Sequence, residues 1–315
     1  MNDKSIVGIK KVNNLQDESE IKSSIFELLD QMKKRDKIEI TKKANLMIKP
    51  NICLVKGYET GVSVDPFLVK CLVDWLFENY DIETIIIGEA DATELNADIA
   101  FKVLGWEDKF KQYKNVRLLN LTKDEYTSVK IDGLYLTDLK MSKSYIQSDF
   151  LISFGKLKTH TMTGITCTLK NQYGSNPIKN KAKYHPHLDE VICDLNKVRK
   201  PDLCLVDGII AMEGAGPVSG IPDPLGLLIA GNDAVATDHA CAKIMGFNPN
   251  KISHLKLAEK QKLGSTSYEI FGEKIEDVAT KFESVRTWKK IILGTYKIAN
   301  KVPLWKKLLV KIFGA

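Results

Sequence analysis

Short apolar runs alternate along this chain with longer segments in which apolar residues recur at helical spacing. The short runs are rich in Ile, Val and Leu and end in polar residues or glycine, which is typical of buried strands. They predict strands at residues 5–10, 45–49, 84–88, 116–121, 150–154, 203–206 and 226–230. The longer segments predict helices at residues 18–32, 66–79, 96–104, 188–199, 234–245 and 253–262.

Two of the helical segments differ in how much of their surface is apolar. Residues 188–199 predict an amphipathic helix. Its apolar positions are Leu188, Val191, Ile192, Leu195 and Val198. Residues 67–77 are apolar almost all round and predict a deeply buried helix, whereas Asp233 is placed to cap the N-terminus of the helix that follows it.

The alternation of strands and helices predicts an α/β fold, with a mixed, largely parallel sheet and helices on both faces. A length of 315 residues allows one domain or two coupled lobes, and residues 1–280 form the predicted α/β domain. Residues 122–143 have a weaker pattern and predict a hairpin or an insertion. The composition, 44% hydrophobic and 27% charged, is that of a globular protein and excludes a disordered, collagenous or integral membrane chain.

The net charge of +6 is concentrated in a basic C-terminal tail, which we define as residues 285–315. It contains eight basic residues and no acidic residue, which leaves the rest of the chain slightly acidic. One face of a predicted helix is apolar and includes Trp305, and the opposite face carries Lys306, Lys307 and Lys311. This pattern is typical of an interfacial helix on an anionic membrane, too short in its apolar runs to span it, but docking on the protein core or on another subunit is equally consistent.

The cysteines argue against a self-contained iron–sulfur cluster or a zinc ribbon. All six are dispersed along the chain: Cys53, Cys71, Cys167, Cys193, Cys204 and Cys241. Clusters and structural zinc sites need closely spaced thiolates. Reduced thiols, together with an N-terminus that has no apolar signal-like stretch, predict a cytoplasmic protein, peripheral on the inner face of the membrane if the tail binds lipid. No nucleic-acid-binding motif is present.

Residues 150–188 contain six lysines and three histidines but no acidic residue, so this segment attracts anions. Lys156, Lys158 and His160 follow the predicted strand at 150–154, where α/β proteins place their ligands. We predict Lys158, His160 and Lys170 as catalytic residues, with His160 as an acid/base or a metal ligand, and Lys156 and Asn171 as substrate-binding residues. Further along, Lys179, Lys181 and Lys183 fit a solvated basic loop better.

A glycine-rich segment, Asp207 to Pro222, follows the predicted strand at 203–206. It departs from the dinucleotide-binding fingerprint, which requires GxGxxG leading into a helix. Its backbone N–H groups could bind an anion at Gly214, Gly216 and Gly220, and its carboxylates a divalent metal, although a plain turn between strands is a competing interpretation. The predicted metal ligands are Asp207, Glu213, Asp238 and His185. Lys49 and Asn51, at the end of another predicted strand, are further substrate-binding candidates.

Several segments together resemble the family catalogued as domain of unknown function 362. They are KPNICL, GKLKTHTMTGITCTLKNQYG, HPHLDEVICDLNK, LVDGIIAMEGAGPVSGIP and DAVATDHACAKIMGF. The resemblance runs from about residue 45 to 264 and implies an α/β protein whose motif residues share one site. Longer members carry a ferredoxin-like segment with clustered cysteines, which this chain lacks.

These observations favour an enzyme for a small anionic substrate that bears a carboxylate or a phosphate, with a divalent metal as an open alternative for its cofactor. The competing hypothesis is a non-catalytic or redox-accessory protein that binds a metal centre or an iron–sulfur partner and is tethered by its tail. A redox partner protein or a homo-oligomer would complete such a site.

Overall fold

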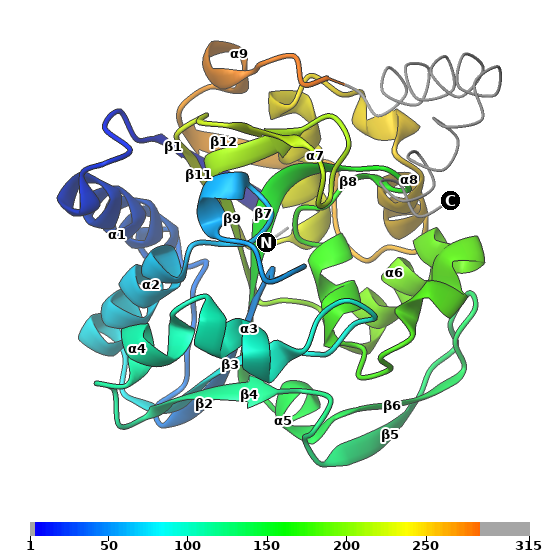
Figure 1. Ribbon diagram of the computed structural model, residues 1–315. Coiled ribbons are helices and arrows are strands. Elements are labelled where there is room, and N and C mark those ends of the chain that lie inside the picture. The colour runs from blue at the N-terminus through cyan, green and yellow to red at the C-terminus, as the bar shows by residue number, and fades with distance from the viewer. Residues whose placement is uncertain (1–3, 284–315) are drawn as a thin grey trace, which may run out of the picture.

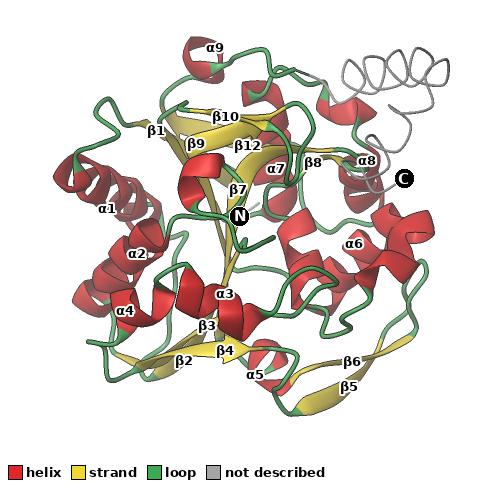
Figure 2. Ribbon diagram, viewed as in Figure 1, coloured by secondary structure: helices red, strands yellow, loops and turns green. Residues whose placement is uncertain are grey.

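The computed structural model describes residues 4–283 and has a central sheet with helices on both faces (Figures 1 and 2). The strands of the main sheet are β1 (Ser5–Lys11), β2 (Ala44–Pro50), β3 (Ile82–Glu89), β4 (Val116–Asn120), β7 (Phe150–His160), β8 (Gly164–Ile165), β9 (Leu203–Glu213), β10 (Ile221–Asp223), β11 (Leu227–Gly231) and β12 (Tyr268–Gly272). Their order is β12-β1-β11-β9-β7-β2-β3-β4, with β10 paired to β9 and β8 to β7. The predicted α/β fold is confirmed.

The sheet is mixed but largely parallel. Neighbouring strands from β9 through β7, β2 and β3 to β4 are parallel, whereas β11 runs antiparallel to both β9 and β1. N-terminal β1 lies between C-terminal β11 and β12, so both ends of the described chain contribute to one sheet. A separate hairpin, β5 (Tyr126–Lys130) with β6 (Asp138–Ser142), occupies the segment predicted as a hairpin or an insertion.

Two layers of helices cover the sheet. The helices are α1 (Glu18–Lys34), α2 (Pro66–Asn79), α3 (Ala97–Val103), α4 (Trp106–Phe110), α5 (Lys143–Ile146), α6 (Leu188–Val198), α7 (Ala234–Ile244), α8 (Ser253–Lys260) and α9 (Ile275–Val278). The first four pack in one hydrophobic core and α5 to α8 in the other. Alternate residues of a strand enter different cores, as Ile48 and Met47 of β2 do.

The predicted helices are found nearly where the sequence places them. The helix predicted at 66–79 has those same bounds, with Asp65 as its N-cap and Pro66 in its first turn. Asp233 caps α7 by accepting hydrogen bonds from two backbone N–H groups, as predicted. Short 3-10 helices complete the chain: η1 (Tyr58–Thr60), η2 (Lys170–Ser175), η3 (Lys181–His187) and η4 (Pro249–Lys251).

Two strand predictions ended too early. The strand predicted at 150–154 continues to His160 as β7, so Lys156, Lys158 and His160 lie within it and not after it. The strand predicted at 203–206 continues to Glu213 as β9 and includes Asp207. Strand β7 lies in the middle of the sheet and all of its residues are buried, which brings charged side chains into the interior.

The basic C-terminal tail, with the amphipathic helix predicted for it, lies outside the described residues. Within residues 4–283, no helix combines the length and the apolar character needed to cross a bilayer.

Candidate functional site

A pocket of about 640 Å³ opens where β2 and β3 end, and it is bordered by loops and 3-10 helices. Parallel strands in α/β sheets place their carboxyl ends at one edge, which is where ligands bind. The polar and charged residues that line the pocket are Lys49, Asn51, Cys53, Glu89, Thr93, Glu94, Lys170, Asn171, Tyr173, Lys181 and His185. The structure therefore brings together five predicted site residues, Lys49, Asn51, Lys170, Asn171 and His185.

The floor of this pocket is a buried ion pair. The Nζ of Lys49 lies 2.6 Å from Oε2 of Glu89 and donates to the Pro50 carbonyl at 2.7 Å. Glu89 also accepts from the backbone N–H groups of Ile52 and Ala90. A Cβ at Gly174 would lie 2.8 Å from the Lys49 Nζ, so glycine permits η2 to pass this close. This ion pair has no net charge and gives the pocket a rigid floor.

Lys170 and Lys181 differ from Lys49 because neither forms an ion pair with a carboxylate of residues 4–283. The Lys170 Nζ lies 4.3 Å from the centroid of the Tyr173 ring, and the Lys181 Nζ donates to the Asp91 carbonyl at 2.5 Å. Burial lowers the pKa of each lysine to about 8. Lys181 is buried, so the prediction that it belongs to a solvated loop was wrong.

Lys158 is fully buried and its ammonium contacts three acceptors. Its Nζ donates to the Val62 carbonyl at 2.5 Å and to the Pro217 carbonyl at 3.4 Å, and lies 3.1 Å from Sγ of Cys53. Burial lowers the pKa of Lys158 below its ordinary value. Its contacts join strand β7 to the loop after β2 and to the glycine-rich loop, residues 214–220 between β9 and β10, so Lys158 holds two walls of the pocket together.

Lys156 forms a second buried ion pair, away from the pocket lining. Its Nζ lies 2.6 Å from Oδ2 of Asp207, and both side chains are almost fully inaccessible. Asp207 also accepts from the backbone N–H groups of Ile209 and Asp65. The acceptor capacity of Asp207 is thus used by Lys156 and by the backbone of β9 and the start of α2.

His160 lies at the end of β7, and the residues that line the pocket do not include it. Its Nδ1 accepts from the backbone N–H groups of Met162 and Thr163 at 3.2 and 3.3 Å. Burial, and then the positive charges of Lys170 and Lys158, hold the pKa of His160 well below its usual range. The ring is therefore neutral near pH 7, with its proton on Nε2.

The glycine-rich loop connects antiparallel β9 and β10. Gly216 packs so closely on β7 that a Cβ would lie 2.1 Å from the Thr159 carbonyl oxygen. The Gly214 carbonyl accepts from the Thr159 hydroxyl at 3.0 Å, and a Cβ at Gly220 would lie 2.3 Å from the Glu213 carbonyl oxygen. The pocket lining does not include these three glycines, but it does include Pro217 and Val218 of the loop. The glycines thus set the path of the loop that places these two apolar side chains.

The four predicted metal ligands have separate surroundings. Glu213 accepts from the Glu283 N–H at 2.6 Å, Asp207 pairs with Lys156, and His185 lines the pocket. Asp238 accepts from the backbone N–H groups of Thr168 and Leu169, at 2.7 and 2.9 Å, which fixes the segment before Lys170. Within residues 4–283, no three His, Cys, Asp or Glu side chains are grouped so that they could hold a metal ion.

The pocket residues that sequence reasoning missed include Cys53, Tyr173 and Lys181. Cys53 is half-buried, whereas the other five cysteines are buried. Its place directly after KPNI, at the end of a predicted strand, was an available signal. The burial of Lys181 had no local signal, because it depends on a carbonyl 90 residues away.

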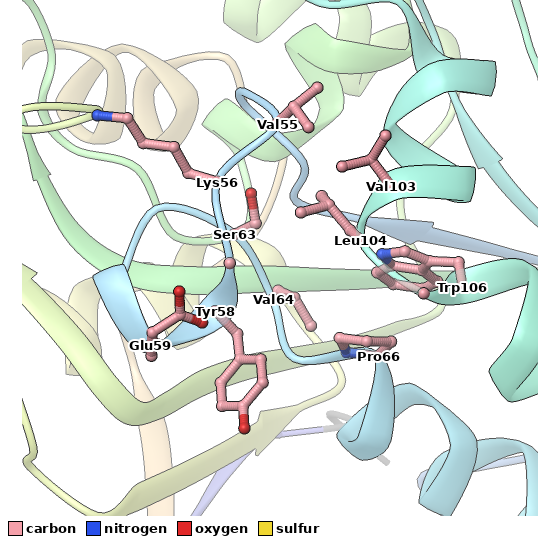
Figure 3. A pocket seen from close by; sticks show the side chains of 12 residues that line it. Val55, Lys56, Tyr58, Glu59, Ser63, Val64, Pro66, Val103, Leu104 and Trp106 are labelled. Carbon is pink, nitrogen blue, oxygen red and sulfur yellow. The ribbon is translucent and has the colours of Figure 1, made fainter.

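A second pocket, of about 520 Å³, is lined by residues 55–59, 63, 64 and 66 and by Val103 to Trp106 (Figure 3). Tyr58, Val64, Pro66 and Leu104 give it a mostly apolar lining, with Lys56 and Glu59 at one side (Figure 3). None of the predicted site residues lines it.

This chain is similar to a described protein family and to known proteins. A family model described as a domain of unknown function (DUF362) matches residues 46–243. A thylakoid-associated protein of Synechocystis sp. is 34% identical over 151 residues, which are 44% of this chain and 47% of that protein. The lactate racemase apoprotein from Thermoanaerobacterium thermosaccharolyticum aligns with a TM-score of 0.42 and 13% identity, over 81% of this chain and 56% of that one. The chain spans about half the length of each.

Proposed function

This chain belongs to the DUF362 family, as its motifs predicted, and we propose that it is an enzyme that binds a small anionic substrate, a carboxylate or a phosphate, through Lys170 and Lys181. The observation that carries the proposal is a pair of ammonium groups in one pocket without carboxylate partners among the described residues. Lys181 is buried and Lys170 is half-buried. A cation that is removed from water is costly unless it is paired, so an anion that enters the pocket supplies the missing charge.

The same two lysines suit proton transfer. A group whose pKa is about 8 is present in both protonation states near neutral pH, which is the condition for an efficient general acid or base. Lys170 lies at the pocket surface over Tyr173 and is our candidate for this role. Glu89, a carboxylate of the pocket, is already paired with Lys49, and no step of the proposal uses a metal ion.

Calorimetry of sulfate and phosphate binding tests the proposal. We expect Lys170→Gln and Lys181→Gln each to weaken binding at least tenfold, because each removes one charge-assisted contact. Lys179→Gln is the matched control, since Lys179 is an exposed lysine of the same acid-free segment and does not line the pocket. Equal losses in all three variants, or no binding by the wild type, would reject the proposal.

We also propose that the basic C-terminal tail associates with anionic membranes. The eight basic residues of the tail, with no acidic residue among them, support this, and the similar Synechocystis protein is thylakoid-associated. Flotation with phosphatidylglycerol vesicles tests it in the full chain. Replacement of Lys306, Lys307 and Lys311 by Glu should abolish flotation, and unchanged flotation would contradict a charge-driven association.

A further inference from the structure

The 640 Å³ pocket has two chemically different sides. Helices η2 and η3 carry its cations, Lys170 and Lys181. Three loops, which follow β2, β3 and β9, contribute an apolar wall that the cation-binding proposal does not use. The wall consists of Ile52, Leu54, Ala90, Ala92, Leu95, Pro217 and Val218.

Part of this wall is left open to solvent. Of its residues, Ile52 and Leu95 are buried, whereas Leu54, Pro217 and Val218 are each half-buried. Apolar surface gathered in a concave site gains free energy when a ligand removes it from water. A pocket for an anion such as sulfate alone would need no such wall.

The wall is held in place before any ligand binds. The Lys56 Nζ donates to the Val218 carbonyl at 3.0 Å and links the loop after β2 to the glycine-rich loop. Lys158 donates to the Pro217 carbonyl from below. Since these bonds fix the backbone on both sides of the wall, little ordering cost remains for a ligand that covers it.

We propose, as a consequence of the anion-binding function above, that the ligand is a single-chain amphipathic anion. Its carboxylate or phosphate binds Lys170 and Lys181, and its aliphatic portion lies along Leu54, Pro217 and Val218. The volume of about 640 Å³ suits one drug-sized molecule, so the ligand is an amphiphile free in solution and not a diacyl lipid.

Calorimetry with two homologous series, acetate to octanoate and methyl to hexyl phosphate, tests the inference below the concentrations at which micelles form. Each added methylene should strengthen binding about threefold to fourfold until the wall is covered. Leu54→Ser and Val218→Ser should flatten this dependence and leave sulfate affinity unchanged. Val55→Ser is the matched control, because Val55 neighbours Leu54 but lines the second pocket (Figure 3).

The possible failures are distinguishable. Sulfate binding without a chain-length effect would overturn the amphipathic ligand and leave the anion site standing. A chain-length effect that Val55→Ser removes would also overturn it, because the aliphatic chain of the ligand would then bind elsewhere. A chain-length effect that survives in Lys170→Gln at undiminished affinity would overturn it too, because the ligand would then bind without its charged end. If neither sulfate nor any amphiphile binds, the proposed function itself fails.

Discussion

Tyr173 contacts both pocket lysines that have no carboxylate partner within residues 4–283, since its ring lies 4.3 Å from the Lys170 Nζ and its hydroxyl donates to the Lys181 carbonyl at 2.6 Å. Tyr173→Phe keeps the ring beneath Lys170 and removes the hydrogen bond, which is typically worth about 0.5 to 1.5 kcal/mol. We expect sulfate affinity to fall severalfold in this variant. Tyr173→Leu should weaken it further, because the cation–π contact is lost as well.

Calorimetry on both variants, with thermal unfolding as a check on folding, measures these effects. Equal affinities of Tyr173→Phe and the wild type would show that the hydroxyl does not position Lys181 for the anion.

The affinity for sulfate should fall as the pH rises through about 8. The pKa of Lys170 and of Lys181 is about 8, and the anion binds their protonated forms, so binding is full below that pH and is lost above it. Sulfate keeps its charge across this range. The charged and titratable groups that act on the two lysines are Lys49, Cys53, Glu89, Asp91 and Lys158.

We expect at least a tenfold loss of affinity between pH 7 and pH 9.5, measured by calorimetry. Lys170→Arg should make the decline shallower, because arginine stays protonated throughout. An affinity that is constant up to pH 10 would contradict the assignment of these lysines to the anion.

Because Lys156 forms a buried ion pair with Asp207, we expect substitution of Lys156 to change the stability of the fold and not substrate binding. Lys156→Met leaves the fully buried Asp207 carboxylate without its cation and should lower the free energy of unfolding by about 3 to 5 kcal/mol. The double variant Lys156→Met, Asp207→Asn removes the stranded charge and should recover much of this loss. Urea unfolding of the wild type, both single variants and the double variant measures the coupling. Additive losses would show that the two groups do not depend on each other.

The same ion pair explains how far the sequence could predict the fold. Helix α2 was predicted to the residue because its signals, an N-cap aspartate, a first-turn proline and an apolar run, are local. Strand β7 was predicted too short because Lys156 and Lys158 interrupt its apolar run. Lys156 is tolerated inside the sheet only through Asp207, which lies 51 residues away.

The residues of the site likewise fall into those that have a local sequence signal and those that depend on tertiary contacts. Lys49, Asn51, Lys170 and Asn171 were predictable because they lie next to strand ends or in an acid-free segment, and the structure places them in one pocket. The burial of Lys181 and the contact of Cys53 with Lys158 depend on tertiary packing that no local pattern encodes. Whether the predicted residues bind a substrate is decided by the experiments above.

Cys53 should be the first cysteine to react in the native protein. It is half-buried in the pocket wall, and the other five cysteines are buried. With iodoacetamide, a bond forms between Sγ and the acetamide carbon as iodide leaves, and mass spectrometry of native protein should find one modified site. Octyl phosphate should slow this reaction, and Cys53→Ala should abolish it. First labelling at Cys71 or Cys193 would show that the pocket is less accessible than a buried core position.

We expect substitution of His254 to stabilise the protein. The His254 side chain is inaccessible, neither ring nitrogen has a hydrogen-bond partner among residues 4–283, and Nδ1 lies 3.9 Å from Oδ1 of Asp189. Burial, with a smaller effect of Lys170, lowers the pKa of His254 to about 3. Between about pH 6.5 and pH 3, the unfolded chain therefore binds a proton at this histidine that the folded chain does not bind. The free energy of unfolding falls as the pH is lowered through this window, by roughly 4 to 5 kcal/mol in total.

His254→Leu removes both the unsatisfied nitrogens and this proton linkage. We expect its unfolding midpoint to exceed that of the wild type at pH 7.5, because a buried polar group without partners costs about 1 to 3 kcal/mol. The difference should widen as the pH is lowered to 4. His187→Leu, at an exposed histidine, is the control and should show no widening. A variant that is less stable than the wild type at both pH values would mean that the His254 ring is satisfied in solution, by bound water or by Asp189, and contributes to the fold.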